Sequence, residues 1–255
     1  MGGDPETQIL AAAKLQRISE TCPSDIFIAG YPRSGNTWMQ YLVAGLALDL
    51  NPRLAPDTLV QSLVPDVHAT KFYKRFGTPT FFKTHHLPQP EYRRVIYLVR
   101  DGRDTMVSYF HFLAALGDTP DFLQLVTTGE GLFPCRWHEH VEAWLANPHR
   151  AEMMIIHYET LKQNTVGELQ RICQFAGLER DRSLIERIAQ NSTFAAMRAR
   201  EATLGWQDAW PKDRAFVRRG IVGSFKDEMP KPVLETFMES SESAMRRLGY
   251  LSERR

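Results

Sequence analysis

Several features that mark secreted, metal-binding or membrane-spanning proteins are missing from this chain of 255 residues. Its three cysteines, Cys22, Cys135 and Cys173, lie far apart and form no C-x-x-C pair, so the sequence predicts neither a disulfide framework nor a zinc site. The N-terminus shows no basic start followed by an apolar core, so no signal peptide is expected. The longest apolar stretch, residues 41–48, is far too short to cross a bilayer. We therefore expect a cytoplasmic protein in a reducing compartment.

An excess of charge of one sign is also missing, because the formal net charge is only +1. Such a balance gives no overall field for nucleic acid or for a membrane surface, so any anion site must come from local clustering. The apolar content of 43% and the charged content of 24% are ordinary for a globular protein. With no repeats and no low-complexity linker, residues 1–255 are expected to form one domain.

Short apolar segments alternate with helical patterns along the chain. Strands are expected at residues 25–30, 80–83, 94–99 and 153–156. Helices are expected at residues 6–20, 37–50, 104–116, 137–146, 165–175, 182–190 and 232–247. The alternation predicts an α/β fold in which a central parallel sheet is covered by helices on both faces, as three α/β/α layers.

Ligands of such sheets bind beyond the carboxyl ends of the strands. Four stretches lie at such ends, and all of them contain polar or ionisable groups: residues 30–37, 83–86, 100–108 and 157–158. Because these ends should meet at one edge of the sheet, their agreement indicates one site more strongly than any single motif does.

The first of these stretches, GYPRSGNT, keeps the spacing of the nucleotide-triphosphatase loop G-x-x-x-x-G-K-[ST] but has Asn36 in place of the lysine. Backbone N–H groups at a helix start hold phosphate, and Gly35 allows a close approach. Ser34 and Thr37 can add donors, and Arg33 could reach across the anion. The missing lysine counts against an ATP-hydrolysing site, and an ordinary strand-to-helix turn is the alternative interpretation.

The second stretch, FFKTHHLP, places Lys83, His85 and His86 after a strand. A histidine near neutral pKa can take a proton from a hydroxyl, and a nearby lysine can stabilise the negative charge that develops. A surface turn with incidental histidines is the alternative. Acidic or histidine ligands at metal spacing are missing, so zinc is not expected.

Arginines mark the third stretch and a later one. Arg100 ends a strand and Ser108 follows in the next helix, and a guanidinium with a hydroxyl can grip a second phosphate. Asp101, Arg103 and Asp104 could form local ion pairs and a helix cap, which we favour for Arg103 and Asp104. The later segment FVRRGIVGSF suits a phosphate clamp through its double arginine, and a solvated basic turn is the alternative.

Together these segments resemble the sulfotransferase family that uses 3′-phosphoadenosine 5′-phosphosulfate (PAPS). YPRSGNTW is similar to the family's 5′-phosphosulfate loop YPKSGTTW, and VIYLVRDGRDTMVSYFHF to its 3′-phosphate segment. VRRGIVGSFKDEM resembles R-K-G-x-x-G-x-W-K, and FFKTHHLP resembles K-T-H-L-P, which holds the catalytic histidine. MMIIHYETLKQN and NSTFAAM are similar to two further cofactor segments. The resemblance runs in the family's order from about residue 25 to residue 228.

The resemblance implies a single sulfotransferase domain with a P-loop-like 5′-phosphosulfate loop. It also implies transfer of the sulfuryl group from PAPS to a hydroxyl or amine of a small acceptor, without a metal, leaving adenosine 3′,5′-bisphosphate (PAP). PAPS has no γ-phosphate, which would explain the missing lysine. The catalytic residues it implies are His85 as the base, with Lys83 and Arg33 stabilising charge. The cofactor residues it implies are Arg33, Ser34, Gly35, Asn36, Thr37, Trp38, Arg100, Ser108, Tyr158, Ser192, Phe194, Arg218, Arg219 and Gly220.

The sequence also departs from the family pattern. Arg33 replaces the usual lysine and cannot donate a proton, so its help to the leaving group would be electrostatic. Counted from the strand end the catalytic histidine is His85, and counted back from Leu-Pro it is His86; we favour His85, because the distance from the strand end sets where the side chain points. Ser224 and Phe225 replace an acidic residue and a tryptophan. The dimerisation motif of the animal cytosolic enzymes is not recognisable, so the oligomeric state stays open.

The acceptor is not identified by the sequence. Aromatic residues that could wall its cleft are Trp206, Trp210 and Phe216 on one side and Phe81, Phe110, Phe112, Phe133 and Trp137 on the other. Such a cleft would suit a flat or aromatic acceptor. Residues 205–217 could form a lid or a plain surface loop. The alternative functions are a P-loop kinase or other ATP-binding phosphotransferase, and a non-catalytic nucleotide-binding protein of the same fold.

Overall fold

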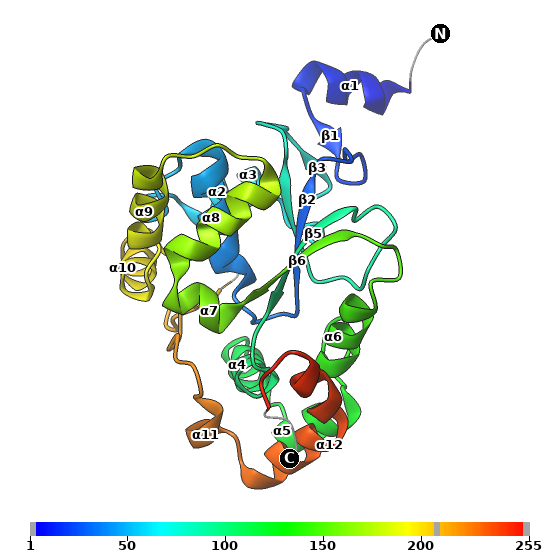
Figure 1. The fold of residues 1–255 in the computed structure, drawn as a ribbon, viewed down its shortest axis with the longest axis vertical. Helices are drawn as coiled ribbons and strands as arrows, with labels where there is room; N and C mark the ends of the chain where they lie inside the picture. Colours follow the sequence, from blue (N-terminus) through cyan, green and yellow to red (C-terminus); the bar gives the residue numbers. More distant parts are fainter. Residues whose placement is uncertain (1–3, 207–209, 252–255) are drawn as a thin grey trace.

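A four-stranded parallel sheet forms the centre of the computed structural model, which describes residues 4–206 and 210–251 (Figure 1). Its order is β4-β2-β5-β6, and its strands are β2 (Ile26–Gly30), β4 (Phe81–Thr84), β5 (Arg94–Val99) and β6 (Glu152–His157). All neighbouring pairs are parallel, so the carboxyl ends meet at one edge. The four predicted strands are confirmed.

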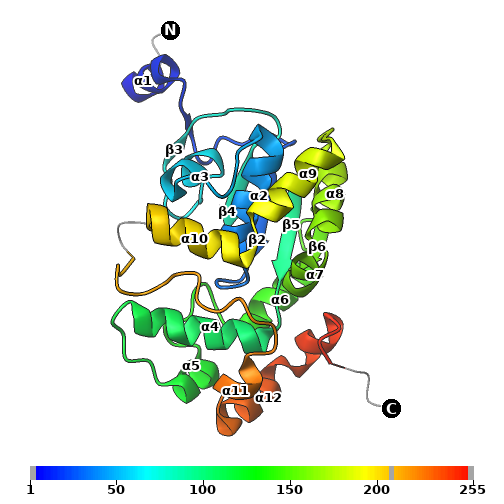
Figure 2. The same cartoon turned by 90° about the vertical axis from the view of Figure 1, so that its left-hand side faces the viewer.

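Helices cover both faces of the sheet (Figures 1 and 2). The helices of the described residues are α1 (Pro5–Ala13), which projects away from the layers, α2 (Asn36–Leu48), α3 (Asp57–Leu63), α4 (Gly102–Ala115), α5 (Phe122–Thr128), α6 (Trp137–Ala146), α7 (Tyr158–Gln163), α8 (Thr165–Ala176), α9 (Arg182–Asn191), α10 (Phe194–Leu204), α11 (Phe225–Glu228) and α12 (Lys231–Arg247). The predicted α/β/α arrangement is confirmed.

Strand β2 shows why the layers form. All five of its residues are buried, as expected for a strand covered on both faces. Side chains alternate along a strand, so Ile26 and Ile28 pack into the core with α2, α8 and α9, whereas Phe27 and Ala29 pack into the core with α4, α6 and α12. No helix in the described residues is both long and apolar enough to cross a membrane.

The predicted helix over residues 6–20 is wrong in its second half. Helix α1 ends at Ala13, where Lys14 takes a left-handed conformation with φ of 56°. The strand β1 (Gln16–Arg17) follows and pairs antiparallel with β3 (Phe72–Tyr73). Pairing with a segment more than fifty residues away therefore overrides the local helical pattern.

A buried ion pair fixes the start of the central strand. The Asp25 carboxylate is fully buried and receives both terminal nitrogens of Arg75, at 2.7 and 2.8 Å. It also accepts from the backbone N–H groups of Cys22 and Thr80. Burial alone would raise the pKa of Asp25, but the hydrogen bonds from Arg75 and the two backbone groups hold that pKa below its usual value.

We predict that Arg75→Ala lowers the free energy of unfolding by about 3–5 kcal/mol, because it leaves a buried carboxylate without its cation. Urea denaturation monitored by circular dichroism measures this change. Arg182→Ala is the control, since Arg182 pairs with Glu186 on the surface and should contribute less than about 1 kcal/mol. Equal small losses for both variants would contradict a structural role for the buried pair.

Candidate active site

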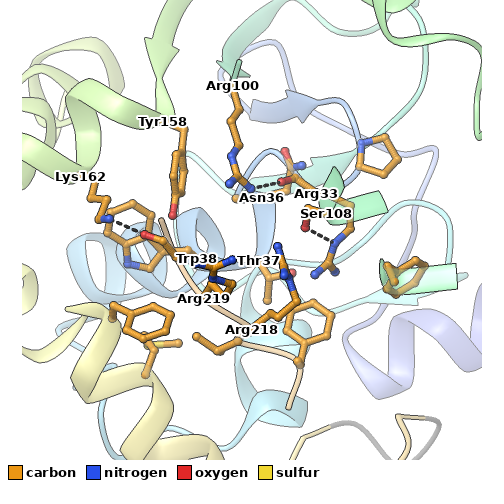
Figure 3. Close-up of a pocket in the computed structure, with 18 of the residues that line it drawn as sticks. Arg33, Asn36, Thr37, Trp38, Arg100, Ser108, Tyr158, Lys162, Arg218 and Arg219 are labelled. Carbon is orange, nitrogen blue, oxygen red and sulfur yellow. Dashed lines mark hydrogen bonds between the residues drawn. The ribbon is translucent and has the colours of Figure 1, made fainter. Parts of the chain in front are cut away.

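A cavity of about 590 Å³ opens at the carboxyl edge of the sheet (Figure 3). All but one of the residues that the sequence predicts for the site line it: Arg33, Gly35, Asn36, Thr37, Trp38, Lys83, His85, Arg100, Ser108, Tyr158, Ser192, Phe194, Arg218, Arg219 and Gly220. The exception, Ser34, is buried beneath the loop with its hydroxyl unpaired among the described residues. The separate motifs of the sequence therefore belong to one cavity.

The loop after β2 turns so that α2 begins beside this cavity. Gly35 has φ of +99°, and a Cβ there would lie 2.8 Å from a ring carbon of Tyr158, so only glycine fits. Asn36 Nδ2 donates to the Tyr31 carbonyl at 2.9 Å, so its amide closes the turn. The first backbone N–H groups of a helix lack partners within the helix, which leaves this end of α2 able to bind an anion.

Arg33 crosses the mouth of the loop between two aromatic rings. Its Nε donates to Ser108 Oγ at 3.3 Å, which joins the loop after β2 to α4 (Figure 3). Its guanidinium carbon lies 4.8 Å from the ring centroid of Phe112 and 4.6 Å from that of Phe216. The side chain thus contacts both the expected cofactor side and the aromatic side of the cavity.

The guanidinium group of Arg33 is close enough to those of Arg100 and Arg218 to be repelled by both. Burial lowers the pKa of Arg33 to about 10, and the charges of Arg100 and Arg218 add to the effect. Arg100 is itself buried, and its Nε has no hydrogen-bond partner among the described residues. Buried polar groups normally find partners, so this arrangement favours a bound anion.

Arg100 also connects the two phosphate segments. Its Nη1 donates to the Arg33 carbonyl at 3.2 Å and its Nη2 to the Ile221 carbonyl at 3.3 Å. Its guanidinium lies 4.8 Å from the ring centroid of Tyr158. One side chain at the end of β5 therefore sets the distance between the loop after β2 and the segment that precedes α11.

The predicted local ion pairs and helix cap are present at the start of α4, whereas the main contacts of Asp104 were not predicted. Asp101, not Asp104, caps α4 and pairs with Arg103 at 2.7 Å. Asp104 is fully buried and accepts from the backbone N–H groups of Gly223 at 2.7 Å and Phe225 at 2.9 Å. It therefore anchors the far end of the arginine segment to α4, a contact between residues about 120 positions apart.

His85 and His86 have different surroundings. His85 lines the cavity, and its Nδ1 lies 2.7 Å from the Gly30 carbonyl, so Nδ1 carries the proton and Nε2 keeps its lone pair. Burial lowers the pKa of His85 to about 3, with the charge of Lys83 adding to the effect. His86 turns to the Tyr92 hydroxyl at 2.9 Å and is not among the residues that line the cavity.

Trp38 and Ser192 lie together on the opposite side of the cavity. Trp38 Nε1 donates to the Ser192 carbonyl at 2.8 Å, and its ring meets Tyr158 edge to face. The Ser192 hydroxyl is occupied, since it donates to the Ile188 carbonyl. Phe194 is 40% exposed beside them, so its ring surface is open to a planar ligand.

The sulfotransferase domain family model matches residues 23–249 of the chain. The chain belongs to the sulfotransferase family. The predicted enzyme class, a PAPS-dependent sulfotransferase, is thereby confirmed.

Individual relatives agree with this assignment. The sulfotransferase is 28% identical to sulfotransferase 1B1 of Mus musculus over 89% of its own length and 85% of the relative's. It is 29% identical to sulfotransferase 2B1 of Homo sapiens, over 87% and 66% of the two chains.

Solved structures share the fold. Retinol dehydratase in complex with androsterone and the inactive cofactor PAP is matched with a TM-score of 0.68 and 21% identity, over 89% of this chain and 82% of that one. Mouse sulfotransferase SULT7A1 complexed with PAP is matched with a TM-score of 0.65 and 22% identity, over 91% and 89% of the two chains.

The aromatic wall of the sulfotransferase differs from the prediction. Phe112, Trp206, Trp210 and Phe216 line the cavity, as expected. The other predicted wall residues do not: Phe81 and Trp137 are buried in the cores on opposite faces of the sheet, Phe110 stacks on Phe122, and Phe133 lies against His68. The suggested lid over residues 205–217 includes Gln207, Asp208 and Ala209, which lie outside the described residues.

The sequence analysis missed several polar residues around the site. Lys83 Nζ pairs with Asp66 Oδ2 at 2.7 Å, and His68 Nε2 accepts from the backbone N–H of His85 at 2.8 Å. Asp66 and His68 belong to a segment that forms a parallel bridge to β4 at Lys83. No local sequence pattern predicted this bridge. Lys162 lies one helical turn after Tyr158 in a short helix, a spacing that could have indicated it.

Among the described residues, no group of three or more His, Cys, Asp or Glu side chains could hold a metal ion.

Gly220 is held from two sides. Its carbonyl accepts from Lys162 Nζ, and a Cβ on it would lie 2.3 Å from a ring carbon of Phe194. We predict that Gly220→Ala displaces that ring and weakens PAP binding about tenfold or more, measured by titration calorimetry.

Gly223→Ala is the matched control for this prediction. Gly223 also has a positive φ, of 81°, but a Cβ there meets no atom within 4 Å. Gly223→Ala should therefore show the effect of backbone strain without the clash. It should weaken PAP binding much less than Gly220→Ala does. If both variants bind PAP equally, Gly220 is needed only for its backbone conformation.

Proposed function

We propose that this sulfotransferase moves the sulfuryl group of PAPS to a hydroxyl or amine of a small acceptor, with His85 as the general base. The observation that carries the proposal is the position of His85, whose side chain, with Nε2 unprotonated, lines the same cavity as Lys83 and Arg33. His86, the competing histidine, bonds to Tyr92 instead.

The residues present fit the two anionic ends of PAPS. Gly35 leaves room for a close approach at the start of α2, where the backbone N–H groups favour a 5′-phosphosulfate. Arg100, whose Nε has no hydrogen-bond partner among the described residues, and Arg218, which lines the same cavity, favour a 3′-phosphate. Trp38 and Phe194 provide ring faces for the adenine. The cofactor itself supplies the activated sulfuryl group.

In the proposed reaction, His85 Nε2 accepts the proton of the acceptor hydroxyl. The acceptor oxygen forms a bond to sulfur while the bond from sulfur to the phosphate oxygen breaks, and PAP leaves. Lys83 and Arg33 stabilise the charge that develops on the transferring group and the leaving phosphate. Arg33 remains protonated throughout, so it acts by its charge alone.

A small acceptor is supported by the relatives of known structure, since retinol dehydratase has been solved with androsterone and with retinol. An aromatic acceptor is favoured by the rings of Phe112, Trp210 and Phe216 around the cavity. We further propose that residues 1–255 act as one domain without a metal and in the cytoplasm.

His85→Ala is expected to lower kcat by about 10²–10⁴-fold, because a general base contributes roughly that factor. PAP affinity should be kept, since the imidazole is not proposed to hold the nucleotide. Single-turnover kinetics and calorimetry measure the two effects. His86→Ala is the matched control and should change kcat little; the reverse result would make His86 the base.

The pH profile gives a second readout of this proposal. Because burial and Lys83 hold the pKa of His85 at about 3, its ring stays neutral and able to accept a proton from pH 8 down to pH 5. The value of kcat/KM should therefore show no loss near pH 6.5, where an exposed histidine becomes protonated. An inflection close to pH 6.5 would contradict the buried, neutral base.

The cofactor is tested by calorimetry in EDTA with PAP beside ATP. PAP is expected to bind tightly without metal and ATP much more weakly, because the loop lacks the lysine that reaches the β- and γ-phosphates. Binding of ATP only in the presence of magnesium would overturn the proposed donor and indicate a phosphotransferase.

A further inference from the structure

We propose that Glu228 is a positioning residue of the nucleotide site, which holds Arg218 and Arg219 as a pair directed at the 3′-phosphate and so raises the preference for nucleotides that carry this phosphate. This inference rests on the proposed function, because it assigns a support to the cofactor site described above.

The contacts of Glu228 carry the inference. Arg218 donates to both of its carboxylate oxygens, at 2.5 and 3.2 Å, and Arg219 donates to Oε1 at 2.8 Å. His111 Nε2 lies 2.9 Å from Oε2. The Glu228 side chain is only 15% exposed, whereas those of Arg218 and Arg219 are 30% and 40% exposed. Two long, half-exposed side chains are thus tied to one well-buried group.

Glu228 approaches the arginines from outside the cavity. Arg218 and Arg219 line the cavity, but Glu228 is not among the lining residues. The carboxylate therefore does not occupy the place of the anion. A guanidinium has five N–H donors, so Arg218 can keep its contacts with Glu228 and still offer a donor to a phosphate.

Helix α11, which carries Glu228, has a fixed position. The Asp104 carboxylate binds the backbone N–H groups of Gly223 and Phe225 at the start of this helix. The Arg103 guanidinium lies 4.0 Å from the ring centroid of Phe225. Glu228 closes the helix with a backbone bond to Ser224 at 3.1 Å. The Glu228 carboxylate is therefore held at a fixed position relative to α4, the helix that also carries Ser108.

Helix α4 contacts both the cavity and Glu228. Ser108 and His111 are three residues apart and so lie on one side of the helix. Ser108 lines the cavity, and His111 contacts Glu228. One helix therefore carries Ser108, a predicted ligand of the 3′-phosphate, and also contacts Glu228, which holds the predicted ligands Arg218 and Arg219.

The physical effect is preorganisation. Without the carboxylate, the repulsion between Arg218 and Arg33 would no longer be offset, and Arg218 would lose more freedom on binding. The negative charge of Glu228 opposes an incoming phosphate, but at half-exposed arginines solvent screens that repulsion. Positioning should therefore outweigh repulsion, and removal of the carboxylate should weaken binding.

The test compares PAP with adenosine 5′-phosphate, which lacks the 3′-phosphate, by titration calorimetry. Glu228→Gln is expected to weaken PAP binding roughly threefold to tenfold and to leave adenosine 5′-phosphate unchanged, so that the affinity ratio falls. In an Arg218→Ala, Arg219→Ala background the same change should have no effect on the ratio. A general loss of structure would instead weaken both ligands.

Asp227→Asn is the matched control, since it removes the same charge from an exposed neighbour in the same helix. It should leave the affinity ratio unchanged. An unchanged ratio in Glu228→Gln, or tighter PAP binding, would overturn the inference, the latter by showing that the carboxylate competes with the phosphate. If the unmodified protein shows no preference for PAP, the proposed cofactor site itself is wrong.

Discussion

The repulsion of the Arg33 guanidinium by two neighbouring guanidiniums is the constraint on which the active site depends. Arg33, Arg100 and Arg218 converge at the carboxyl edge of the sheet, and the cost appears in the lowered pKa of Arg33. Among the described residues, no carboxylate lines the cavity. Backbone carbonyls accept from Arg100, whose Nη2 lies 4.0 Å from the buried Asp104 carboxylate, and Glu228 holds Arg218 from outside. An anion with two charged ends would complete the balance.

The segment before α11 illustrates how such an arrangement is kept in place. Residues 218–224 form no strand or helix before α11, yet side chains from other elements hold this segment along its length. Lys162 of α7 donates to the Gly220 carbonyl, and Arg100 donates to the Ile221 carbonyl. Asp104 accepts from the backbone N–H groups of Gly223 and Phe225. A loop with so many anchors can present its arginines as accurately as a regular element would.

The proposed catalytic residues are held in the same way. Lys83 and His85 are two residues apart at the end of β4, and each is held by a group from another part of the chain. Asp66 pairs with Lys83, and the Gly30 carbonyl sets the proton on the imidazole of His85. The role of each group is thus set less by its type than by the partner that the fold brings to it.

The sequence by itself determined the four strands of the central sheet, the order of the motifs and most of the charged residues that line the cavity, because apolar strands and the polar residues at their ends are local patterns. Tertiary structure alone decided which histidine enters the cavity, that Asp104 and Glu228 support the arginine segment, and that Phe81 and Trp137 are core residues. These outcomes depend on contacts between distant segments. A local pattern records that a side chain is polar or aromatic, but the partner it meets is set only when the chain folds.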